Sequence, residues 1–75
     1  MSVVFAQGEV RVVYRQMTAL LTTAIEDDEL VIELDQLTHW QPPHDALEVS
    51  LDNLLAITQM IEQEADRLNL PIAFA

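Results

Sequence analysis

A run of acids from Glu26 to Glu29 is the densest group of side chains that could do chemistry, and Glu33 and Asp35 follow closely. A cluster of this sign attracts a basic surface, such as the active cleft of a nuclease, and speeds association with it. Turns also collect acids that only keep a small apolar protein soluble, and this second interpretation is favoured. The run lacks the spacing, the glycine and the later glutamate of a calcium loop.

Two histidines five residues apart, His39 and His44, lie with Asp45 in a segment that contains two prolines. Their spacing matches no standard ligand pattern, so we expect surface histidines and neither a metal site nor a cofactor. A nucleophile is also missing, because the chain has no cysteine and no lysine, and its serines are Ser2 and the helix-cap candidate Ser50. These observations argue against an enzyme with catalytic residues.

Thirteen acids outnumber three arginines, which gives a formal net charge of −10. Residues 1–25 contain one acid and two arginines, whereas residues 26–75 contain twelve acids and one arginine. A field of this sign repels phosphate backbones and anionic lipid, so we expect neither nucleic acid nor a membrane as partner. The sequence favours a basic protein partner instead.

The length of 75 residues predicts a single domain, residues 1–75, with a marginal core. Hydrophobic residues make up 51% of the chain, and no cysteine is present to form a disulfide. Small domains without disulfides or metals often gain stability by self-association, so we expect a homodimer or a higher oligomer. The absence of cysteine, of a signal-peptide pattern and of a long apolar run favours a cytoplasmic protein.

The spacing of apolar residues predicts a helix over Leu51–Leu68, with Ser50 as its N-cap. Asn69 is a suitable left-handed stop, and Pro71 cannot continue the helix. One apolar stripe should face the core, and it consists of Leu54, Ile57, Ile61, Ala65 and Leu68.

Alternating apolar residues predict strands over Glu9–Arg15 and Glu29–Leu34, and Gly8 marks a turn before the first of them. Met17–Ile25 suits either a helix or a strand, and its paired threonines and short connections favour a strand. Glu26–Asp28 is then a hairpin turn. The final residues, Pro71–Ala75, predict a short closing strand at a sheet edge.

The predicted fold class is therefore α+β: a small antiparallel sheet of three to five strands, with one long helix in the C-terminal half packed on one face and a short closing strand. The lone tryptophan, Trp40, either packs in the core or is an exposed binding residue. The prolines beside it indicate a fixed loop, so core packing is favoured.

The order of strand, aspartate, W-x-P-P, capped helix and closing strand resembles the immunity-protein-74-like family of bacterial polymorphic toxin systems. The glycine-led strand Gly8–Tyr14 is also similar, although the second hairpin lacks the glycines of that family. The resemblance implies a non-catalytic protein that binds and blocks a cognate toxin. The matching residues are Ile32, Leu34, Asp35, Leu37, Trp40, Pro42, Pro43, Ile57, Ile61 and Phe74.

The leading hypothesis is an acidic immunity protein that inhibits a basic toxin. One alternative is a self-associating structural or accessory protein encoded in an operon or mobile cassette, and a weaker one is a DNA mimic. A neighbouring gene for a toxin domain would favour the first. We expect the partner contact at Glu26, Asp27, Asp28, Glu29, Asp35, Trp40, His44 and Asp45.

Overall fold

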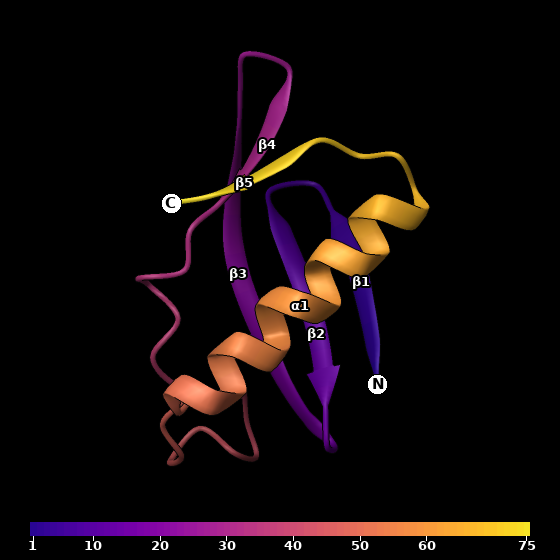
Figure 1. The fold of residues 1–75 in the computed structure, drawn as a ribbon. Helices are drawn as coiled ribbons and strands as arrows, with labels where there is room; N and C mark the ends of the chain where they lie inside the picture. Colours follow the sequence, from indigo (N-terminus) through magenta and orange to yellow (C-terminus); the bar gives the residue numbers. More distant parts are fainter.

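The computed structural model describes all of residues 1–75, as one sheet with one helix on it (Figure 1). The sheet order is β1-β2-β3-β4-β5, and every neighbouring pair is antiparallel except β4 and β5, which are parallel. The predicted α+β class is confirmed, and the parallel closing strand makes the sheet mixed. The elements are β1 (Ser2–Ala6), β2 (Glu9–Tyr14), β3 (Met17–Glu26), β4 (Glu29–Ile32), α1 (Leu51–Arg67) and β5 (Ile72–Phe74).

The segment that suited both a helix and a strand is β3, the longest strand of the sheet. Its first part, Met17–Thr22, pairs with β2, and its last part, Thr23–Glu26, pairs with β4 along the opposite edge. The β3–β4 hairpin therefore extends beyond the block formed by β1, β2 and α1 (Figure 1).

Two of the three hairpin turns have positive φ angles without glycine. Arg15 and Gln16 have φ of 50° and 66°, and Asp27 and Asp28 have φ of 52° and 62°. Two successive left-handed residues give the turn whose twist matches that of the flanking strands. Gly8 has a φ of 80° in the β1–β2 turn, as its position predicted.

The helix begins as the sequence predicts, because the Ser50 hydroxyl accepts a hydrogen bond from the Asn53 backbone N–H at 3.2 Å. It ends at Arg67, and Asn69 has the left-handed φ of 55°. Its predicted stripe is correct except at the last position, where Leu68 lies past the final turn and is 48% exposed. The fully buried part of the stripe consists of Ile57, Ile61 and Ala65.

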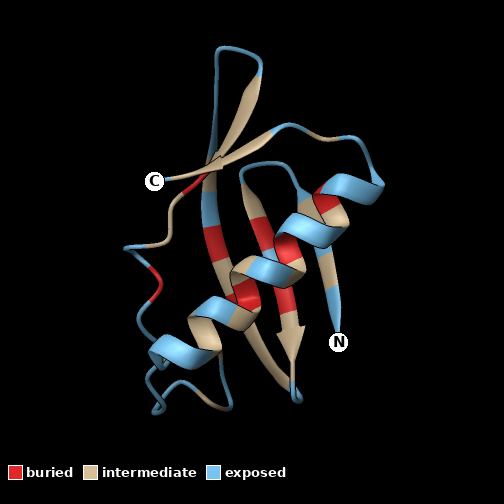
Figure 2. Ribbon diagram, in the orientation of Figure 1, coloured by how far each residue is buried: buried red, intermediate tan, exposed pale blue.

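The core lies between this stripe and one face of the sheet, and it contains no buried polar side chain. The helix crosses β1 and β2 (Figure 2), while the opposite face of the sheet has no helix over it. No helix in the structure has the combined length and apolarity needed to cross a membrane. The sheet side of the core is formed by Val10, Val12, Ala19, Leu21 and Ile32.

Replacing Ile61 with alanine should lower the free energy of unfolding by about 2–5 kcal/mol, because a fully buried side chain leaves a cavity. Leu55→Ala is the matched control on the same helix. Leu55 is half-exposed, and its loss should cost no more than about 0.5 kcal/mol. Urea titration followed by circular dichroism measures both values, and equal costs would contradict the proposed helix orientation.

Gln16→Gly should raise the free energy of unfolding by about 1 kcal/mol, because glycine removes the steric cost of the left-handed conformation. Gly8→Ala should lower it by a similar amount. A Cβ atom at Gly8 meets nothing within 4 Å, so the loss would come from the backbone alone. Thermal melts of the two variants should shift in opposite directions, and a destabilising Gln16→Gly would refute the turn assignment.

Candidate partner-binding site

The β3–β4 hairpin carries four consecutive carboxylates at the end of the molecule. Asp27 and Asp28 form the two-residue turn, where short polar side chains tolerate positive φ. Glu26 and Glu29 flank the turn and lie directly opposite each other in the ladder. The first three of these residues are exposed and Glu29 is half-buried. The predicted turn is thus present, with Glu26 as the last residue of β3.

No cation of the chain neutralises this cluster. The Arg11 guanidinium lies 3.8 Å from the Glu9 carboxylate, and that of Arg67 lies 2.7 Å from Glu64. Arg15 sits over the Tyr14 ring, 5.3 Å from its centroid. Like charges directly opposite in a ladder destabilise it by roughly 0.2–1 kcal/mol, so a cationic partner would relieve repulsion that the free protein retains.

Ile25 is the apolar residue beside this cluster, and it is 78% exposed. It lies opposite Leu30 in the ladder, on the face that α1 covers further along the sheet. Ala19 and Leu21, on the same face of β3, are buried, but the hairpin that carries Ile25 extends past the end of the helix layer (Figure 2). Ile25 was not among the contact residues expected from the sequence. The only signal was its position next to four acids.

Trp40 packs in the core and is only 2% exposed, which confirms the structural interpretation of this residue. Its ring stacks on that of Tyr14, with centroids 6.5 Å apart and planes 10° apart. Next to it, the Gln41 N–H donates to the Thr18 carbonyl at 2.8 Å. Trp40 therefore fixes the loop against β3 and leaves little of its own surface for a partner.

The other predicted contact residues do not join the hairpin. His44 is half-buried, and Asp35 and Asp45 are exposed. All three lie with Trp40 in the segment between β4 and α1, residues 33–50, which we call the Trp40 loop. The loop meets β3 at Thr18, nine residues from Asp27, so about 30 Å of strand separates the two regions. The predicted residues form two separate surfaces, the acidic hairpin and the Trp40 loop.

The exposed histidine, His39, has its Nδ1 3.1 Å from the Thr38 hydroxyl. No three His, Asp or Glu side chains lie close enough together to hold a metal ion.

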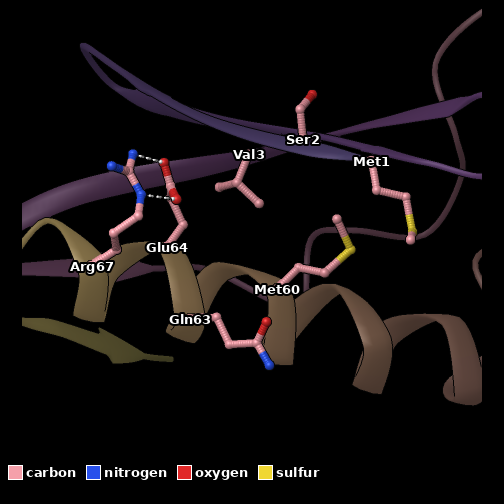
Figure 3. A pocket seen from close by; sticks show the side chains of 7 residues that line it. All are labelled: Met1, Ser2, Val3, Met60, Gln63, Glu64 and Arg67. Atoms are coloured by element: carbon pink, nitrogen blue, oxygen red, sulfur yellow. Dashed lines mark hydrogen bonds and ion pairs between the residues drawn. The ribbon is translucent and has the colours of Figure 1, made fainter.

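The helix carries the strongest ion pair of the molecule. The Arg67 guanidinium donates to both carboxylate oxygens of Glu64, at 2.8 and 2.7 Å, and these bonds hold the pKa of Glu64 below its ordinary value. The pair lies in a groove of about 580 Å³ between α1 and β1 (Figure 3).

The fold and the site define a small α+β domain whose most distinctive surface is an uncompensated acidic hairpin. The family model described as immunity protein 74 matches residues 4–75, so the chain belongs to the immunity protein 74 family. The resemblance carried by the W-x-P-P segment is thereby confirmed. No curated protein and no solved structure matches the chain.

Replacing Trp40 with alanine should lower the free energy of unfolding by about 3–5 kcal/mol, because a buried aromatic ring and its stacking contact are lost. Tyr14→Phe keeps the stacked ring and should change stability by less than about 1 kcal/mol. Denaturant titration measures both. A Trp40→Ala variant as stable as the parent would show that the loop is not held by this side chain.

Proposed function

We propose that the protein is a non-catalytic immunity protein that binds and blocks a basic toxin through the β3–β4 hairpin. Membership of the immunity protein 74 family supports a toxin as the partner. The feature that carries the proposal is the group of four carboxylates without an intramolecular cation, next to the exposed side chain of Ile25. This combination offers charge for steering and an apolar side chain for the contact itself.

The partner surface that fits the hairpin is a lysine- or arginine-rich cleft wide enough for a two-residue turn. The net charge of −10 supports fast association with such a surface and repels nucleic acid and anionic lipid. A nuclease active site has this character, because it binds phosphates. Occupation of the cleft by carboxylates would exclude the substrate without any chemical step.

The toxin would meet this protein in the cytoplasm, where a cysteine-free chain loses nothing to reducing conditions. The Trp40 loop, with His44 and Asp45, is a second candidate surface, about 30 Å from the hairpin. A partner would need to extend along most of β3 to touch both. The hairpin is the stronger candidate because its charges are the more concentrated.

A DNA mimic is a weaker candidate, because it needs carboxylates spaced along a surface as phosphates are spaced along a strand. Here the carboxylates gather at one turn, and Asp35 lies beyond the other end of β4. The exposed apolar side chains favour a protein interface more than electrostatic mimicry alone.

The double variant Asp27→Lys with Asp28→Lys should slow association with the cognate toxin, sought among the products of neighbouring genes, by about tenfold or more at low salt, because steering charges are reversed. Stopped-flow or surface plasmon resonance measures the association rate. Added salt should slow association of the parent strongly and association of the variant little. Stability should remain near that of the parent, since both side chains are exposed.

The matched control is Glu62→Lys with Asp66→Lys, which changes the net charge equally on the exposed surface of α1. This control should slow association clearly less than the hairpin variant does. Equal rates for the parent and the hairpin variant, or equal losses in the two double variants, would refute the hairpin as the contact. If no neighbouring gene product with a toxin domain binds the protein, the assignment of an immunity function to this chain fails.

A further inference from the structure

The outer edge of β1 is the longest open strand edge of the sheet, because β1 has five residues and no partner strand on that side. At the opposite edge of the sheet, β5 has only three residues and begins after Pro71. A short strand and a proline both protect an edge from pairing with another strand. The edge of β3 beyond β4 is covered where Gln41 and Glu33 donate to the Thr18 and Thr22 carbonyls. β1 has no such cover. Its five residues include no charge and no proline, and its ladder with β2 runs without a bulge.

The register identifies which backbone groups point outward from β1. The Thr23 N–H donates to the Gly8 carbonyl, so Gly8 and every second residue after it in β2 bond to β3. Hydrogen-bonding groups point to alternate sides along a strand, so the residues of β2 in between bond to β1. Their partners in β1 are Ser2, Val4 and Ala6. The N–H and C=O groups of Val3 and Phe5 consequently face the open edge. Such an unpaired row is a template for another strand.

The same edge is the least negative part of an otherwise acidic protein. Residues 1–8 contain no charged side chain. Two ion pairs lie on the elements beside this edge, Glu9 with Arg11 on β2 and Glu64 with Arg67 on α1, and each pair is neutral as a whole. Two copies with a charge of −10 each repel one another least when they meet here, and the acidic hairpins then stay far from the contact.

We propose that β1 pairs antiparallel with β1 of a second copy, about a two-fold axis at Val4. Val3 of each copy then exchanges backbone hydrogen bonds with Phe5 of the other, and the two Val4 side chains lie against each other. Val4 is 53% exposed on the face without the helix. The axis keeps both helices on one face, so the groove beside Met60 and the Glu64–Arg67 pair, shown for one copy in Figure 3, would face the same groove of the second copy.

This contact uses a different surface from the proposed toxin contact, and neither depends on the other. An interface built from one short strand and the adjoining groove is smaller than the standard size of about 800 Å² per partner. The dimer is therefore weak, and it dissociates on dilution.

The test is sedimentation velocity of the whole protein from about 1 μM to several hundred μM, a range in which weak dimers form and dissociate. The parent should show concentration-dependent dimers. Val4→Lys and Val4→Glu should each be monomeric, because like charges meet at the axis, and an equimolar mixture of the two should dimerise again. Ile25→Lys, an exposed control outside the edge, should associate like the parent. Melting temperatures verify that each variant is folded.

Cross-linking gives an independent readout, because the chain has no cysteine of its own. In the proposed register the two Val4 Cα atoms are about 4.5 Å apart, within disulfide range. Val4→Cys should therefore form a covalent dimer under mild oxidation far faster than Ile25→Cys. A parent that stays monomeric throughout, or equal cross-linking of the two cysteine variants, would overturn the proposal. So would slow amide exchange at Val3 and Phe5 only when toxin is bound, which would assign the edge to the toxin.

Discussion

The packing of one helical stripe on one face of the sheet is the constraint on which the rest of the molecule depends. Ile57, Ile61 and Ala65 are fully buried against the sheet, and no polar side chain is buried with them. A chain of 75 residues has material for only one such layer. The fold therefore covers one face over β1 and β2 and leaves other surfaces uncovered.

The exposed hairpin, the open edge of β1 and the packing of the Trp40 loop all follow from that limited coverage. The helix layer does not reach the β3–β4 hairpin, so Ile25 remains exposed although its alternation places it on the helix side. The helix also stops short of closing the edge of β1, where a groove remains between the two elements. The Trp40 loop covers the early part of β3, and the Trp40 ring stacks on that of Tyr14.

The sequence predicted those parts of the fold that depend on local chemistry. Ser50 caps the helix, Asn69 ends it, and the alternation in β2 and β3 gives the correct strands. The parallel pairing of β5 was not predictable, because it depends on where the chain returns after α1. The exposure of Leu68 has the same origin, since it lies past the last helical turn.

The candidate site was predictable in its residues and not in their arrangement. The acids from Glu26 to Glu29 and their turn are visible in the sequence, because a turn between two strands must come to the surface. The distance between this turn and Trp40 is set by the length of β3 and by the path of the loop. Neither the length of β3 nor the path of the loop can be predicted from a short stretch of sequence. The residues expected to form one surface therefore lie on two.

The uneven distribution of charge links the two proposed contacts. If the twelve acids of residues 26–75 were spread evenly over the chain, any self-association would bring like charges together. Their absence from residues 1–8 leaves one neutral edge, and their concentration in the β3–β4 hairpin leaves one strongly attractive end. β1 and the hairpin tip lie apart in the molecule (Figure 1), so self-association at the edge leaves the hairpin free for a basic partner. A dimer would then present two acidic hairpins, and toxin binding would neither require nor prevent the pairing of the β1 strands.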